Sequence, residues 1–173
     1  NWDAITAHWA RLAGQYQRLD VRKNLDQHNR LIRSILVFID DVAAEHFLSG
    51  LQVGEASWRS LLTLAEELGQ VRAIGLAYIA CVERGDNAPK LRNALQSQLA
   101  EFMLALEEAE NKRPLPETYR KKLLHFIPNY PEPLLRDSAA CTLKAYYQHA
   151  TGVMDELYLQ FDDELRHLVG QTA

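Results

Sequence analysis

Apolar residues recur three and four positions apart along most of this chain, which is the spacing of a helix that packs one face against its neighbours. The step changes to six at Leu19-Asp20-Val21, so we expect a kink or short break there. We therefore expect an all-α fold, an elongated antiparallel helical bundle with four principal helices plus short accessory helices. The apolar stripes cover residues 2–19, 25–42, 61–82, 91–106 and 143–168.

Glycine and proline indicate where several helices end. Gly85 follows the third stripe and is suited to a left-handed helix stop, and Asn87 is placed to cap the next helix ahead of Pro89. A short helix is expected over Glu117–Ile127. Prolines should then prevent its continuation, because proline lacks an N–H and restricts the residue before it. These prolines are Pro128, Pro131 and Pro133.

The last stripe predicts the longest helix, from Leu134 to Val169. An even number of long antiparallel helices would bring Asn1 and Ala173 to the same end of the bundle. Both ends of the sequence resemble cuts through a longer protein. We therefore expect residues 1–173 to form a single helical-bundle domain. An ectodomain fragment excised between two membrane helices would have such ends, and so would a trimmed soluble domain.

Composition excludes several classes of protein. The chain has 173 residues, of which 47% are apolar, enough for one core without a disulfide or metal. Nineteen Lys and Arg against twenty-three Asp and Glu give a charge of 19 − 23 = −4. Acidic and basic residues are mixed along the sequence, and no stripe of basic residues is present that could neutralise phosphates. A nucleic acid is therefore not an expected partner. The sequence has no apolar run of membrane-spanning length.

Catalytic and metal-binding motifs give no indication of an enzyme. The sequence contains no nucleophile elbow, phosphate-binding loop or zinc-protease motif. A di-iron bundle needs two Glu-x-x-His motifs, and only Glu164 and His167 supply that spacing. We expect no enzyme activity, metal or cofactor. Cys81 and Cys141 are either small buried apolar residues or a disulfide between helices, and their spacing leaves both alternatives open.

Three segments, in this order, carry a family resemblance. Residues 24–32 contain H-x-x-L-I, residues 64–75 read L-x-E-x-L-G-x-x-R-x-x-G, and residues 145–158 are similar to Y-F-x-x-x-T-x-x-I-D-x-L-Y. Together they resemble the periplasmic helical sensory domains of bacterial transmembrane methyl-accepting chemotaxis proteins, relatives of which precede diguanylate cyclase or kinase modules. Residues 47–58 depart from the family, which has L-D-P-x-x-x-S-Y-Y-L there.

The resemblance implies an extracytoplasmic ligand-binding sensor domain at the bacterial inner membrane. Such a domain lies in the periplasm, forms a homodimer, and transmits the binding of a small molecule through its terminal helices to a cytoplasmic signalling module. A different class of protein is also compatible with the helical pattern. It is a soluble helical adaptor whose exposed apolar stripe binds a partner helix.

Arg72 is the first candidate ligand-binding residue, because it borders the apolar face of its helix. Its planar guanidinium could bind a carboxylate or another small anion. Alternatively, Arg72 extends its charged end to water or pairs with Glu66 or Glu67. Gly69 and Gly75 flank it, and each would allow something to approach the backbone closely, either a ligand or a neighbouring helix.

The last helix contributes three further candidates. Thr151 and Asp155 lie four residues apart and would offer a hydroxyl and a carboxylate to a polar pocket. Alternatively, Thr151 bonds its own helix and Asp155 is solvated. Tyr147 occupies the apolar stripe predicted for this helix. Tyr147, its neighbour Tyr146 and Tyr78 of the third stripe either line a ligand or are core residues with accessible hydroxyls.

His28 and Asn29 complete the candidate set. His28 occupies an apolar stripe position, and Asn29 stands beside it at the border. As ligand-binding residues they would supply an imidazole and an amide. A lone histidine on an apolar face is more often a core residue with its hydrogen bonds satisfied.

Overall fold

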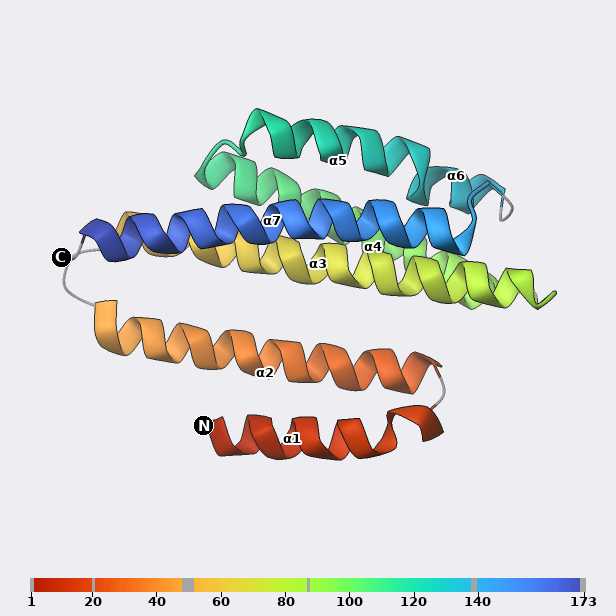
Figure 1. Cartoon of the computed structure of the whole chain (residues 1–173), viewed down its shortest axis with the longest axis horizontal. Coiled ribbons are helices and arrows are strands. Elements are labelled where there is room, and N and C mark those ends of the chain that lie inside the picture. The colour runs from red at the N-terminus through yellow and green to blue at the C-terminus, as the bar shows by residue number, and fades with distance from the viewer. Residues whose placement is uncertain (1, 20, 48–51, 87, 138–139, 172–173) are drawn as a thin grey trace. The chain divides into compact units, whose positions relative to one another are not determined.

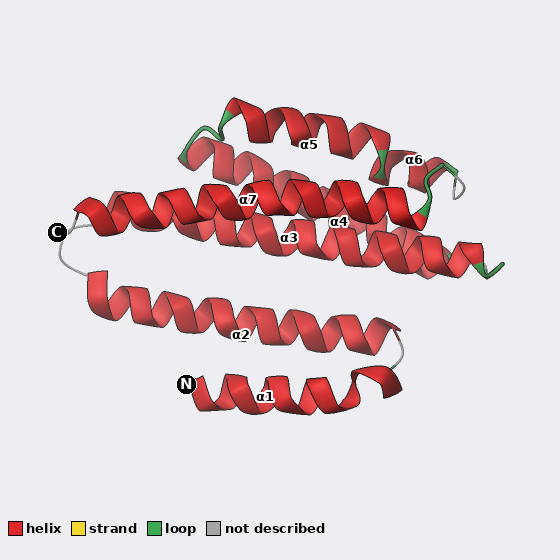
Figure 2. Ribbon diagram, viewed as in Figure 1, coloured by secondary structure: helices red, strands yellow, loops and turns green. Residues whose placement is uncertain are grey.

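The computed structural model describes residues 2–19, 21–47, 52–86, 88–137 and 140–171 (Figure 1). These residues are almost entirely helical and contain no strand, as Figure 2 shows. The prediction of an all-α fold is confirmed. The chain divides into two compact units, Asn1–Gln52 and Val53–Ala173, which we describe separately. The helices are α1 (Trp2–Gln15), η1 (Tyr16–Arg18), α2 (Val21–Phe47), α3 (Gln52–Glu83), α4 (Pro89–Lys112), α5 (Glu117–Asn129), α6 (Pro131–Arg136) and α7 (Leu143–Gln171).

The first unit is a hairpin of α1 and α2. The break between the helices was predicted, and Leu19 takes an extended conformation there, with φ −85° and ψ 140°. Ile5 and Leu12 of α1 pack against Leu31 of α2 in a small apolar core. The side chains of His8 and Gln27 lie 3.1 Å apart across the same interface.

The predicted stripe on α1 was too wide. Ile5 and Leu12 are buried, whereas Trp2 and Trp9 are 54% and 55% exposed. Residues seven apart lie on one line of a helix, so positions 5 and 12 form one line and positions 2 and 9 another. Leu31 covers the line of Ile5 and Leu12, whereas Trp2 contacts α2 at its edge, with its ring 5.6 Å from that of Phe38 between centroids.

In the second unit, α3, α4, α5, α6 and α7 surround one apolar core. The largest side chains in this core are completely or almost completely buried, and each of the five helices contributes at least one of them. They include Leu64, Leu68, Leu95, Phe102, Tyr119, Leu123, Leu134, Tyr146 and Leu157.

The first two helices of this unit end and begin close to the predicted positions. α3 ends at Glu83, and Gly85 has a φ of 81°, so the predicted left-handed stop is confirmed. Ala88 is the N-cap residue of α4 and makes no side-chain capping bond. Asn87, the predicted cap, lies outside the described residues.

Proline placement in α5 and α6 differs from the prediction. α5 continues through Pro128 to Asn129, two residues beyond the predicted end. Pro128 lies in the last turn, so only one helical N–H is lost and no further turn depends on it. Pro131 begins α6 rather than blocking it, because the first helical position needs no N–H donor.

The prediction of one helix from Leu134 to Val169 was wrong. α6 ends at Arg136, and Asp137 is extended, with φ −138° and ψ 115°. A new helix then begins at Leu143. Its start is marked by the Thr142 hydroxyl, which accepts a hydrogen bond from the backbone N–H of Ala145 at 3.3 Å. This capping interaction favours a separate helix over continuation of α6.

Among the described residues, no helix has both the length and the apolar character needed to cross a bilayer. Asn1 and Ala173, which we expected at the same end of the bundle, lie outside the described residues. A single domain over residues 1–173 stays a prediction.

Candidate functional site between α3 and α7

Three contacts along one line show that α3 and α7 run antiparallel. Tyr146 meets Gly75, Thr151 meets Arg72, and Met154 meets Gly69. Residue numbers rise along α7 as they fall along α3. The motif residues of two distant segments therefore face one another, although Arg72 and Thr151 are 79 positions apart.

Tyr146 sets the closest approach of the two helices. A β-carbon at Gly75 would lie 2.3 Å from the ring and hydroxyl oxygen of Tyr146, so only glycine leaves room for this ring. The Tyr146 hydroxyl donates a hydrogen bond to the backbone oxygen of Val71 at 2.9 Å. Burial raises the pKa of Tyr146, and the nearby Cys141 raises it further, which keeps the phenol a neutral donor. Of the two alternatives for Gly75, a neighbouring helix accounts for the close approach.

Arg72 and Thr151 meet beside this contact. Nη1 of Arg72 donates to the Thr151 hydroxyl at 3.4 Å, and both residues are half-buried. This long bond is the only hydrogen bond or ion pair that the Arg72 side chain makes with described residues. A guanidinium has five N–H donors, so most of its donor capacity is not used by the protein.

The acidic residues that could have paired with Arg72 do not do so. Glu66 accepts a hydrogen bond from Gln70 at 3.2 Å, within α3. Glu67 accepts one from Gln98 of α4. Among the described residues Arg72 forms no ion pair with either glutamate, so that part of the alternative for Arg72 does not describe this structure. Thr151 bonds to Arg72, and no bond from its hydroxyl to its own helix is present.

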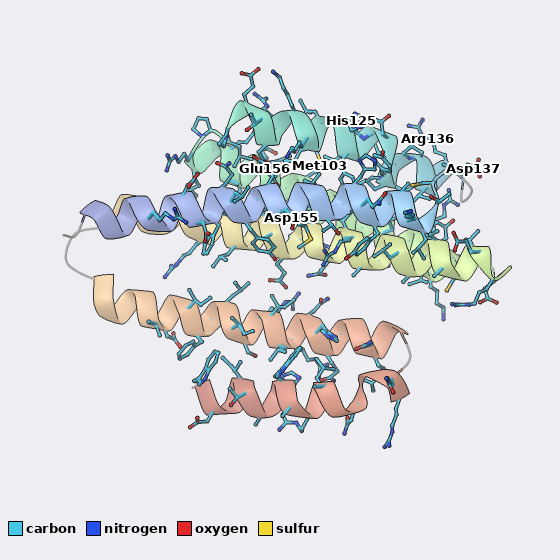
Figure 3. All side chains as sticks on the ribbon, viewed as in Figure 1. Met103, His125, Arg136, Asp137, Asp155 and Glu156 are labelled. Carbon is cyan, nitrogen blue, oxygen red and sulfur yellow. The ribbon has the colours of Figure 1, made fainter. Side chains whose placement is uncertain are left out.

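Asp155 and Tyr147 lie one turn on either side of Thr151, and both are exposed. Figure 3 labels Asp155 and its neighbour Glu156, which pairs with Lys122 of α5. Asp155 makes no hydrogen bond or ion pair with any described residue, which agrees with the solvated alternative.

The predicted stripe position of Tyr147 was wrong. Tyr147 is 50% exposed, whereas Tyr146 is completely buried. The buried line of α7 therefore runs through Tyr146, Ala150 and Met154. Tyr147 stays close to Thr151 in sequence, but its side chain is not part of the core.

His28 and Asn29 belong to the other unit and are half-buried on α2. Nδ1 of His28 lies 2.8 Å from the backbone oxygen of Asn24. A carbonyl oxygen only accepts, so Nδ1 donates this bond within its own helix. The structure brings Arg72 and Thr151 together, but it does not relate either of them to His28 or Asn29.

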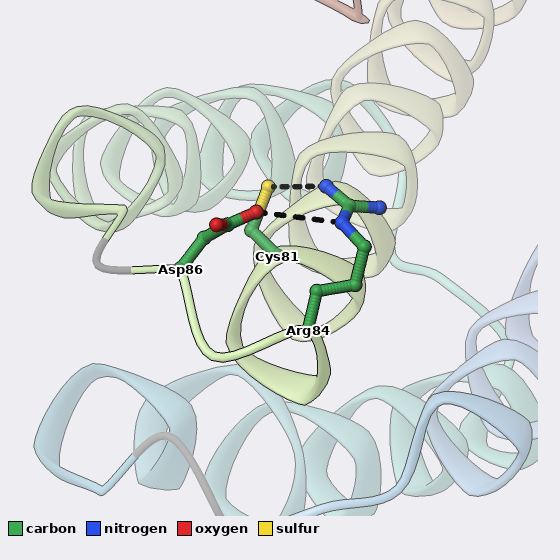
Figure 4. Close-up of polar contacts among 3 residues, drawn as sticks. All are labelled: Cys81, Arg84 and Asp86. Atoms are coloured by element: carbon green, nitrogen blue, oxygen red, sulfur yellow. Dashed lines mark hydrogen bonds and ion pairs between the residues drawn. The ribbon is translucent and has the colours of Figure 1, made fainter.

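Both cysteines are free thiols. Cys81 lies near the end of α3, where Nη2 of Arg84 donates to its sulfur at 3.3 Å while Nε of Arg84 bonds Asp86 at 3.4 Å (Figure 4). Cys141 donates to the backbone oxygen of Thr142 at 3.3 Å. Burial raises the pKa of the Cys141 thiol. The disulfide alternative therefore does not describe this structure.

Sequence reasoning missed one aromatic cluster, which joins α5 to α7. Tyr130 stacks on His149 with ring centroids 4.3 Å apart, and the rings of His125 and His149 are 6.2 Å apart. His149 is far from His125 and Tyr130 in the sequence, and no periodic pattern links it to them. In the part of the chain that the structure describes, no three His, Cys, Asp or Glu side chains are grouped to hold a metal ion.

Comparison with family models, curated proteins and solved structures found no match for this chain. The motif residues and the geometry of α3 and α7 are therefore the features of this chain that bear on its function.

Proposed function

We propose that this chain is the extracytoplasmic ligand-binding sensor domain of a bacterial transmembrane chemoreceptor. The observation that carries the proposal is the meeting of Arg72 and Thr151. These are motif residues from two separate segments that resemble one sensory family, and they form a polar pair where α3 and α7 pack. The proposal includes the periplasmic face of the inner membrane as the location. It also includes an antiparallel four-helix arrangement of α3, α4, α5 and α7.

The proposed ligand is a small anion, with a carboxylate as the simplest case. Arg72 has one long bond to a neutral hydroxyl and no carboxylate partner among the described residues. A planar anion could accept two parallel N–H bonds from its guanidinium, which are stronger than the bond to Thr151. The Thr151 hydroxyl would then donate to the same anion. Asp155, one turn away, disfavours a ligand with negative charge on that side.

Signalling would follow from the position of this pair on two long helices. A ligand that binds Arg72 and Thr151 together favours one packing of α3 against α7 over another. Coupling of this kind is typically worth about 1–3 kcal/mol. Because packed interfaces tend to have discrete arrangements, a small displacement of α7 would be carried along its length. Assembly as a homodimer belongs to the same proposal, and sedimentation analysis of the purified chain tests it.

A thermal-shift screen of small carboxylates, amino acids and inorganic anions tests the ligand site. We expect Arg72→Ala to abolish the shift produced by the ligands that stabilise the wild type, while its unliganded melting temperature stays within a few degrees. Thr151→Val, which keeps the side-chain volume, should weaken the same ligands. Arg136→Ala is the matched control, because Arg136 is an exposed arginine on α6 (Figure 3).

Three results would contradict the proposal. They are normal ligand binding by Arg72→Ala, equal loss in Arg136→Ala, and no stabilising ligand in the screen. Collapse of the fold in Arg72→Ala would make that residue structural. In that case Arg72→Lys, which keeps the charge but not the planar fork, should fold and still bind the ligands more weakly.

A soluble adaptor is the second candidate, and exposed apolar residues of α4 favour it. Met103 and Leu104 are 44% and 62% exposed and adjacent, which suits contact with a partner helix. The protein sequence on either side of this chain distinguishes the two candidates. Apolar segments of about 20 residues on both sides select the sensor, and polar segments select the adaptor.

A further inference from the structure

The α1–α2 hairpin contains a hollow of about 590 Å³ that the proposed site between α3 and α7 does not involve. Residues one helical turn apart line it from both helices. His8, Arg11 and Gln15 follow one line of α1, while Lys23, Asp26 and Arg30 follow one line of α2. Leu12, which is buried, and Leu19, which is half-buried, add apolar surface. The hollow is open to solvent and is lined mostly by polar side chains, so it suits a small polar ligand.

The lining of this hollow contains more basic than acidic side chains. Arg11, Lys23 and Arg30 are basic and Asp26 is acidic, and Lys23 has an interaction of its own. Asp26 stands one turn before Arg30 on the same helix, yet no ion pair joins them. Neither Arg11 nor Arg30 forms an ion pair with any described residue. Two guanidinium groups from different helices are therefore available at one hollow, in a chain whose overall charge is negative.

We propose that this hollow binds a small multivalent organic anion, such as a tricarboxylate. Arg11 and Arg30 would each hold one carboxylate group through paired N–H bonds. Two guanidinium groups from different helices suit a ligand with more than one negative charge. The apolar surface of Leu12 and Leu19 suits a short carbon skeleton. Gln15 and Gln27 would supply amide donors at the edge of the site.

Calorimetric titration of the whole chain with citrate, at constant ionic strength, tests this proposal. We expect Arg11→Gln and Arg30→Gln each to weaken citrate binding about tenfold, since each removes charged hydrogen bonds. Asp26→Asn removes the opposing charge and should tighten binding. Arg18→Gln is the matched control: it removes the same charge from an exposed residue of η1 that does not line the hollow, and it should change the affinity little.

Several outcomes would overturn the proposal. One is that the wild-type chain does not bind citrate. Another is that Arg18→Gln weakens binding as much as Arg11→Gln, which would indicate general attraction by positive charge. If Arg72→Ala abolishes citrate binding while Arg11→Gln leaves it intact, citrate binds between α3 and α7 instead. Should Arg11→Gln fail to fold, the opposite changes expected for Arg30→Gln and Asp26→Asn still decide the question.

Discussion

The ring of Tyr146 packs so closely on Gly75 that a β-carbon at residue 75 would not fit. Its ring carbons and hydroxyl oxygen come within 2.3–2.6 Å of that position, closer than real β-carbon contacts. The hydroxyl reaches past Gly75 to the backbone oxygen of Val71. At this contact the side chain of Tyr146 packs directly against the backbone of α3.

Replacement of Gly75 by alanine should destabilise the protein. Tyr146 is completely buried and has little freedom to move away, so we expect the free energy of unfolding to fall by about 1–3 kcal/mol, as in other overpacked cores. Urea denaturation measures this change. Gly152→Ala is the control, because no atom lies within 4 Å of its added β-carbon. Alanine at that exposed helical position should raise stability by up to about 1 kcal/mol. Changes of the same sign in both variants would count against the close contact.

Tyr146→Phe should lower stability without changing the packing of the ring. The variant loses the hydrogen bond to Val71, which is typically worth about 1 kcal/mol in net stability. The change is measured as a shift of the urea midpoint. Tyr147→Phe removes a hydroxyl from the adjacent, half-exposed residue and should alter stability by less than about 0.5 kcal/mol. Equal effects of the two substitutions would mean that the bond to Val71 contributes nothing.

Tyr119→Phe should not lower the stability of the protein, in contrast to Tyr146→Phe. Tyr119 on α5 is completely buried, and its hydroxyl has no hydrogen-bond partner among the described residues. A buried hydroxyl without a partner costs free energy, so its removal should leave stability unchanged or raise it by about 1 kcal/mol. Thermal denaturation of the variant beside the wild type is sufficient. A clear loss of stability would show that this hydroxyl has a partner, for example a buried water.

Alkaline pH should destabilise the protein through the same two tyrosines. Burial raises the pKa of Tyr119 and of Tyr146 above the ordinary value of 10.0. Both phenols stay protonated in the folded chain, whereas in the unfolded chain they ionise near pH 10. The folded state then binds more protons, so the free energy of unfolding should fall as pH rises above about 10.

This pH dependence can be measured as the melting temperature between about pH 8 and pH 11. The double variant Tyr119→Phe with Tyr146→Phe should show a smaller decline above pH 10 than the wild type. Below pH 10 the melting temperatures of the wild type and the double variant should change with pH in the same way. An unchanged decline in the double variant would assign the alkaline loss to other groups.

Most helices of this protein follow from local pattern. The apolar spacing predicted the long helices, the step of six predicted the break at Leu19, and Gly85 predicted the end of α3. These features depend on residues within one or two turns of each other, so the sequence alone carries them. The start of the last helix did not follow in this way. The apolar stripe covers residues 143–168, and its extension back to Leu134 was wrong, because the bond between Thr142 and Ala145 begins a separate helix.

For the candidate site, the sequence determined that Arg72 and Thr151 border the apolar faces of their helices, because 100° per residue follows from helical geometry alone. Only the tertiary structure decided that they meet, that Glu66 and Glu67 bond elsewhere, and that Tyr146 rather than Tyr147 enters the core. Two adjacent tyrosines fit an apolar stripe equally well. The choice between them depends on the space that another helix leaves, and that space exists only where Gly75 lies opposite.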